Sequence, residues 1–289
     1  MNANRATNPS KGNAMRRLPA AHGKRAAASA AALGLLVLAL TAALPAYADV
    51  YGRRVLGLYK SSEGQTAKEN EILYHLSGPL SEMGLTVDYW DADAGLPPES
   101  AFEDVRAVIS WFRGPSIAHP EDYLRFLNRT VDSGRKLIVL DNLGAYQDRS
   151  SGRYLDTGLI NLTLGRLGLM YLGDWTEDPS VIRVARKDSA VVEKGGEQDP
   201  EVSRFYYRFH PVDRDLETYL SLERTDRDYG SSPVITSNAN GGFALSRYIY
   251  HYADGKVTML LDLKSFLREA LFPAPKGAVS YTHLTLPTN

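Results

Sequence analysis

The chain has 289 residues, of which 44% are hydrophobic and 23% are charged, and its formal net charge is −1. This is the composition of a globular protein with enough length for one or two hydrophobic cores. The sequence contains no cysteine, which excludes disulfide bonds, cysteine nucleophiles and cysteine metal sites. Its six histidines show no helical metal-ligand spacing, so we expect neither a bound metal nor another cofactor.

The first 48 residues differ from the rest in composition. Basic residues precede an apolar run from Ala26 to Leu44, and the segment closes on Ala46-Tyr47-Ala48. This pattern is typical of a secretory signal peptide over residues 1–48, cleaved after Ala48, and it predicts a periplasmic or secreted protein. The alternative is an uncleaved anchor, which would make the membrane a partner, since the run is almost long enough to span a bilayer.

The charge balance shifts once this segment is set aside. Residues 1–48 hold six of the 33 basic residues and none of the 34 acidic ones, which leaves 27 against 34, a balance of −7. Nucleic acid is therefore a poor partner, because its phosphates bind basic surfaces. An acidic surface suits neutral or cationic ligands, although it also serves solubility alone.

Apolar runs alternate with amphipathic stretches between residues 54 and 140. We predict strands over 54–59, 86–89, 106–112 and 136–140, a helix over 66–83 capped by Thr66 and Glu69, and a helix from Pro120 to Gly134. These strands are continuous apolar runs, which is typical of a parallel sheet covered on both faces. The pattern predicts an α/β fold with a flavodoxin-like, doubly wound parallel sheet.

The second half of the chain has a different pattern. Strand-like segments occur at 180–188, 219–223, 233–237, 241–252 and 256–263, and the last two flank Ala253-Asp254-Gly255, a hairpin turn. We expect them to be antiparallel strand additions beside the parallel core. Residues 263–271 predict a short amphipathic helix, and residues 272–278 a linker to a missing C-terminal domain.

The last eleven residues, Val279–Asn289, are uncharged and unlike what precedes them. The codons GTC TCT TAT ACA CAT CTG ACG CTG CCG ACG would encode residues 279–288. That DNA resembles the transposase end and adapter used to prepare sequencing libraries. We therefore interpret residues 279–289 as an adapter-derived artefact, the alternative being a natural apolar tail, and exclude them from fold reasoning.

Polar and aromatic side chains follow each predicted parallel strand. Ligands bind beyond the carboxyl ends of such strands, where the strand order reverses. Carboxylates and amides bond sugar hydroxyls, and aromatic rings cover the apolar faces of sugar rings, so this lining suits carbohydrate as well as it suits ordinary turns. The candidate ligand-binding residues are Lys60, Glu63, Asp91, Trp111, Arg113, Asp141, Asn142 and Tyr146.

Two tyrosine-rich segments, 204–211 and 247–252, have two interpretations. They are either a stripe that faces carbohydrate or packing between layers, because alternating tyrosines in a strand serve both purposes. No residue is identified as catalytic.

The stretch "VLDNLGAYQ" (139–147) resembles the strand–nucleophile–helix turn of class I glutamine amidotransferase-like domains, which read roughly "GICLGHQ". Asn142 falls on the nucleophilic cysteine of that pattern, and an amide cannot be activated as a thiolate can. The resemblance therefore implies an amidotransferase-like domain over residues 49–271 that has no glutaminase chemistry.

A wider resemblance rests on "RRVLGLYKSSEG", "VRAVISWF", "GKVTMLLDLKSFLREAL" and the proline-containing linker. With these motifs, residues 53–277 resemble exported bacterial proteins in which such a domain precedes a polysaccharide deacetylase-like domain, similar to Pel-type exopolysaccharide-processing proteins. The metal-binding motifs of the deacetylase part are absent here, so no catalytic or metal residue is transferred.

This resemblance implies a non-catalytic, carbohydrate-associated module of a polysaccharide-modifying protein. Its expected partners are a polysaccharide and its own C-terminal domain. Two alternatives stay open. One is a glycoside hydrolase-like enzyme that uses strand-end carboxylates, and the other is a structural scaffold of an exopolysaccharide export complex.

Overall fold

The computed structural model of the protein describes residues 52–192, 205–245, 248–253 and 255–273. The predicted signal peptide, the predicted adapter-derived tail and residues 274–278 of the predicted linker lie outside these residues. Within the described part of the chain, no helix is both long enough and apolar enough to cross a bilayer.

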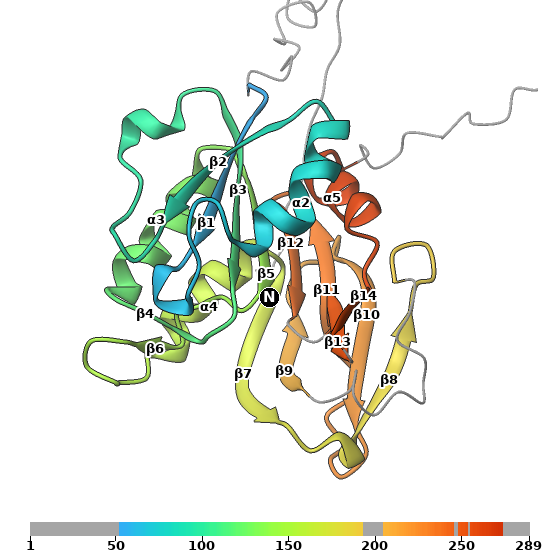
Figure 1. The fold of residues 1–289 in the computed structure, drawn as a ribbon. Coiled ribbons are helices and arrows are strands. Elements are labelled where there is room, and N and C mark those ends of the chain that lie inside the picture. The colour runs from blue at the N-terminus through green and yellow to red at the C-terminus, as the bar shows by residue number, and fades with distance from the viewer. Residues whose placement is uncertain (1–51, 193–204, 246–247, 254, 274–289) are drawn as a thin grey trace, which may run out of the picture. The chain divides into compact units, whose positions relative to one another are not determined.

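One eight-stranded sheet organises the fold, in the order β2-β1-β3-β5-β12-β11-β10-β8 (Figure 1). The first five of these strands pair in parallel, and the last three pair antiparallel. The prediction of an α/β fold with a mostly parallel sheet and antiparallel additions is confirmed. The bounds are β1 (Arg54–Tyr59), β2 (Thr86–Asp91), β3 (Val105–Phe112), β5 (Lys136–Asp141), β8 (Ile182–Lys187), β10 (Glu217–Arg224), β11 (Ser232–Asn238) and β12 (Gly241–Leu245).

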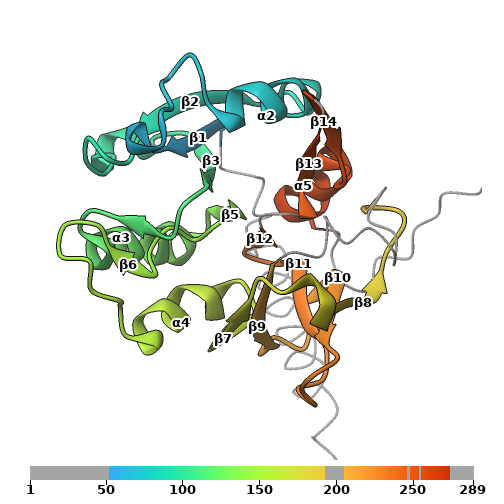
Figure 2. The ribbon, with the colours of Figure 1, turned by 60° about the horizontal axis from the view of Figure 1, so that its bottom comes forward.

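Helices cover both faces of the sheet (Figures 1 and 2). On one face α2 (Glu71–Glu82) contacts β1 and β2 and packs beside α5 (Leu263–Leu271). On the other face α3 (Pro120–Asp132) contacts β3 and β5 and packs against α4 (Thr157–Arg166). Burial on both faces explains the continuous apolar runs: successive β3 residues Trp111 and Phe112 point to opposite faces, and both are fully buried.

β12 joins the parallel and antiparallel parts and is itself covered on both faces. A Cβ atom at Gly242 would lie 2.8 Å from Phe266 in α5. The next side chain, Phe243, packs edge to face on Phe209, with ring centroids 5.2 Å apart. Phe209 belongs to β9 (Tyr206–Pro211), which pairs antiparallel with β7 (Leu169–Thr176). Because side chains alternate along a strand, the β7–β9 ribbon covers the face opposite α5.

The remaining elements are short. β13 (Tyr250–Ala253) and β14 (Lys256–Met259) pair antiparallel, which confirms the predicted hairpin. The predicted antiparallel strand over 241–252 is therefore two strands with different partners. Its first part, β12, pairs antiparallel with β11 but in parallel with β5, so the prediction of a purely antiparallel addition is wrong there. The other short elements are β4 (Ser116–Ile117), which pairs with β6 (Gln147–Asp148), and the 3-10 turns η1 (Ser61–Glu63), η2 (Glu99–Phe102) and η3 (Pro179–Val181).

The first helix begins later than predicted. Asn70 is its N-cap, and the Asn70 Oδ1 accepts a hydrogen bond from the Leu73 N–H at 2.9 Å. Thr66 and Glu69 instead exchange backbone hydrogen bonds in a turn. The predicted capping box is therefore wrong, because an asparagine closer to the apolar stretch supplies the cap. The predicted helix over 263–271 is confirmed to the residue.

Candidate ligand-binding site

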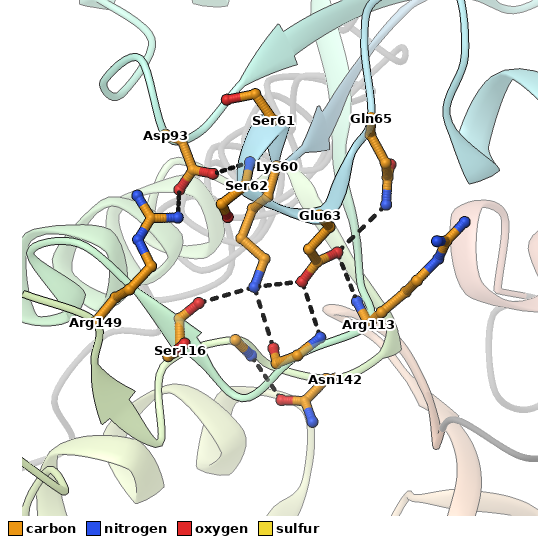
Figure 3. A network of polar contacts seen from close by, with 12 residues as sticks. Lys60, Ser61, Ser62, Glu63, Gln65, Asp93, Arg113, Ser116, Asn142 and Arg149 are labelled. Carbon is orange, nitrogen blue, oxygen red and sulfur yellow. Dashed lines mark hydrogen bonds and ion pairs between the residues drawn. The ribbon is translucent and has the colours of Figure 1, made fainter. Parts of the chain in front are cut away.

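The strand order reverses between β1 and β3, and an internal ion pair fills this place (Figure 3). Lys60 is 1% exposed, and its Nζ lies 2.6 Å from Glu63 Oε1 while donating to the carbonyls of Gly114 (3.2 Å) and Ser116 (2.8 Å). Glu63 also accepts the backbone N–H groups of Arg113 (2.9 Å) and Gly114 (2.8 Å). Three acceptors match the three ammonium protons, so Lys60 and Glu63 connect two loops and have little left to offer a ligand.

The carboxylates of Asp91, the last residue of β2, and of Asp93 also accept hydrogen bonds from the protein itself. Asp91 Oδ1 accepts the N–H groups of Ser61 (3.1 Å) and Asp93 (3.0 Å). Asp93 accepts the Ser62 N–H at 2.8 Å and lies 2.6 Å from Arg149 (Figure 3). Burial alone would raise the pKa of Asp93, but hydrogen bonds from Arg149 and Ser62 outweigh it and lower that pKa. Asp91 therefore stabilises the loops after β1 and β2.

Trp111 points into the hydrophobic core and not into a cleft. It is fully buried, and its ring centroid lies 5.5 Å from that of His75 on α2. The prediction that it lines a binding surface is wrong, because β3 remains covered by a helix at this position. Its neighbour Arg113 is half-exposed, with Nε donating to Glu71 Oε1 at 2.8 Å. His75 Nε2 lies 3.2 Å from the other oxygen of Glu71.

The chain bends sharply after β5. Asp141, a non-glycine residue, has a φ of 69°, in the left-handed region. Asn142 Oδ1 accepts the Gly144 N–H at 2.9 Å, so the oxygen of this amide stabilises the turn. The turn leads into β6, and the next helix, α4, begins only at Thr157. The resemblance to the amidotransferase motif therefore ends at the turn, without a helix directly behind it.

A cleft of about 590 Å³ opens beside this bend. This volume lies in the range of small-molecule pockets, roughly 300–1,000 Å³. The cleft brings together three of the predicted site residues, Arg113, Asn142 and Tyr146. Its walls come from the loop after β3, the turn after β5, the start of α4 and the β7–β9 ribbon. The lining residues are Arg113, Pro115, Asn142, Tyr146, Tyr154, Leu155, Thr157, Ile160, Tyr171, Gly173, Trp175, Glu177, Phe205 and Tyr207.

Aromatic rings form one wall of the cleft. Tyr146 and Tyr207 stack with centroids 5.6 Å apart and an interplanar angle of 12°, and Tyr171 meets both edge-on. Trp175 stacks on Phe205 at 6.3 Å and is 54% exposed. Burial raises the pKa of Tyr207 to about 12, and burial also raises that of Tyr146. The phenols therefore stay protonated and can both donate and accept hydrogen bonds.

Most of the aromatic residues in this wall were not among the predicted site residues. Tyr207 and Phe205 belong to the tyrosine-rich segment 204–211, for which a carbohydrate-facing role was one interpretation. In the same segment Tyr206 is fully buried, so the segment serves both packing and the cleft. Tyr171 and Trp175 lie in β7, and Glu177 directly follows it. No sequence pattern indicated this strand.

Comparison with known proteins gives a family and distant structural similarity. The family described as "Uncharacterised protein conserved in bacteria (DUF2194)" matches residues 33–279. No curated protein matches the chain. Similar solved structures include a glutamine amidotransferase from Thermotoga maritima, with 11% identity, 74% of this chain and 77% of that chain covered, and a TM-score of 0.31. They also include a ThuA-like protein from Bacteroides uniformis, with 14% identity and a TM-score of 0.33. This match covers 68% of this chain and 82% of that chain.

These similarities are too low to carry an argument about the cleft. None of the comparisons supports a relationship to deacetylases or to Pel-type proteins, which stays a prediction.

Proposed function

The chain belongs to the DUF2194 family of bacterial proteins, and we propose that it is a non-catalytic module that binds carbohydrate in its aromatic cleft. The observation that carries this proposal is the exposed face of Trp175 on a packed aromatic wall, beside Arg113, Asn142 and Glu177. Flat aromatic rings cover the apolar faces of sugar rings, and guanidinium, amide and carboxylate groups bond their hydroxyls.

The state of the carboxylates favours binding over catalysis. Glycoside hydrolysis needs two carboxyl groups that face each other across the scissile bond. The oxygens of Glu63 accept hydrogen bonds from its own loops, and Glu71 pairs with Arg113 and His75. Among the described residues that line the cleft, Glu177 is the single carboxylate. The alternative of a hydrolase with strand-end carboxylates therefore has less support than binding.

The proposal includes the setting that the sequence implies. The protein is exported by its N-terminal segment, and the module acts beside a polysaccharide-modifying domain, positioning polymer for it. The chemistry of the cleft is what supports a role beside a polysaccharide: it offers aromatic faces for sugar rings and polar groups that can bond sugar hydroxyls.

Binding is tested with an array of neutral glycans, followed by calorimetric titration of any glycan that binds. Trp175→Ala is expected to weaken binding about five- to thirtyfold, because truncating a central aromatic anchor costs on the order of 1–2 kcal/mol. Tyr74→Ala is the matched control, since Tyr74 is 64% exposed on α2 and does not line the cleft. If no neutral glycan binds, or if the two variants lose affinity equally, the proposal is wrong.

A further inference from the structure

A second cavity, of about 290 Å³, adjoins the aromatic cleft. It lies between the start of α3 and the segment that runs from Asp148 to Leu159. The two cavities share two lining residues, Tyr154 and Leu155. The surface therefore continues from the aromatic cleft across these residues into the second cavity.

Tyr154 stands between the two cavities. Its side chain is the most exposed of the large hydrophobic residues in the described part of the chain, at 79%. The backbone around it is fixed: Gln147 and Tyr154 form a β-bridge, and the Leu155 N–H donates to the Tyr146 carbonyl at 3.0 Å. A single exposed aromatic is ordinary, but the backbone that carries this ring is held where two cavities meet. It can act as a stacking platform for a ligand that crosses from one cavity to the other.

The second cavity is lined by polar side chains of both signs. Arg125 and Arg153 lie among four carboxylates, those of Glu121, Asp122, Asp148 and Asp156. Arg125 and Asp122 pair with each other at 2.9 Å. Such groups bond hydroxyls well. The excess of carboxylates repels an anionic chain, so a neutral, hydroxyl-rich ligand suits this cavity.

We infer that the two cavities form one groove for an extended neutral polysaccharide, whose chain crosses Tyr154 and occupies both. This inference rests on the proposed function and deepens it: the ligand is a polymer segment longer than the aromatic cleft. The aromatic cleft holds one part of the chain, and the second cavity holds the next.

The test compares a disaccharide with a hexasaccharide of the linkage that the glycan array identifies. Occupying the second cavity after the first is an intramolecular step, so the hexasaccharide is expected to bind at least about tenfold more tightly. Arg153→Ala alters only the second cavity and should remove this gain while leaving disaccharide affinity unchanged. Trp175→Ala should weaken both ligands, and Tyr74→Ala neither. Circular dichroism of each variant checks its fold.

The outcomes separate this inference from the proposed function. Equal affinity for both lengths, or an Arg153→Ala variant that retains the full gain, overturns the extended groove and leaves carbohydrate binding in place. Absence of binding for both lengths overturns carbohydrate binding itself.

Discussion

Lys60 is a charged side chain in the interior of the protein, and its ammonium group contacts Glu63 and two backbone carbonyls. Removing one partner of a buried ion pair leaves the other charge without compensation. Lys60→Met is therefore expected to lower the free energy of unfolding by about 3–5 kcal/mol, measured by urea denaturation. Lys264→Met is the control, because Lys264 and its partner Glu82 are both exposed and the loss there is at most about 1 kcal/mol. Similar losses in the two variants would contradict this account of the pair.

Glu71 links stability to pH. Burial alone would raise the pKa of Glu71, but hydrogen bonds from His75 and Arg113 outweigh it and lower that pKa below its ordinary value of 4.5. A carboxyl group whose pKa is lowered in the folded state stabilises the protein above its unfolded pKa, and this contribution is lost as the pH falls through the folded value.

We therefore predict that Glu71→Gln is destabilising at neutral pH and that its difference from the wild type shrinks as the pH drops below 4.5. Urea denaturation at a series of pH values measures this difference. Glu82→Gln, at an exposed position on the same helix, controls for a general effect of acid. A difference that stays constant with pH would contradict the prediction.

At the scale of elements, the junction between β5 and β12 depends on a glycine. Gly241 has a φ of 145°, and a Cβ atom there would lie 1.8 Å from the Leu137 carbonyl oxygen. Gly241→Ala is expected to cost more than about 3 kcal/mol of stability, because the backbone of β5 would have to move. Gly230→Ala is the matched control: its φ is 68°, but no atom outside the residue and its two chain neighbours lies within 4 Å of the added Cβ.

The control variant should lose only about 1–2 kcal/mol, the cost of a left-handed conformation for alanine. Urea denaturation compares the two variants, and hydrogen exchange of the β5 amides shows whether the pairing is lost. Equal losses of unfolding free energy in the two variants would mean that the close approach to Leu137 does not contribute to the cost of Gly241→Ala.

The parallel strands β1, β3 and β5 were predictable from the sequence because burial on both faces leaves them almost uniformly apolar, as in residues 106–112. β7 was not predictable, since its pairing with β9 changes register between Tyr171 and Trp175 and breaks the alternation of a regular strand. α4 was missed because Leu159 and Leu162 are exposed beside the buried Ile160, which blurs its apolar face. The hairpin 250–259 was predictable from its turn residues.

The residues of the candidate site also fall into those that the sequence could predict and those that it could not. The rule that ligands bind at strand ends led to Arg113, Asn142 and Tyr146. It also selected Lys60 and Trp111, whose burial is set by partners distant in the chain. Trp175 reaches the cleft because the β7–β9 ribbon folds over the sheet, a tertiary arrangement that no local pattern encodes.

At the scale of the whole molecule, the cleft is a joint product of the two halves of the chain. The parallel half supplies Arg113 and Asn142, and the ribbon supplies Tyr171, Trp175 and Tyr207. Neither half presents the aromatic wall and the polar groups together. The proposed carbohydrate binding therefore depends on both halves being assembled, so we predict that a variant that loosens β12 loses affinity as well as stability.

The late position of β12 in the chain also has a consequence for biosynthesis. A ribosome that has translated the first four parallel strands has not yet made their fifth neighbour, since Leu137 pairs with Gly241. Until then the open side of β5 carries unpaired backbone groups on which unfinished chains can assemble with one another. The parallel part of the sheet is thus suited to folding only after β12 has been translated, and nascent chains need shielding up to that point.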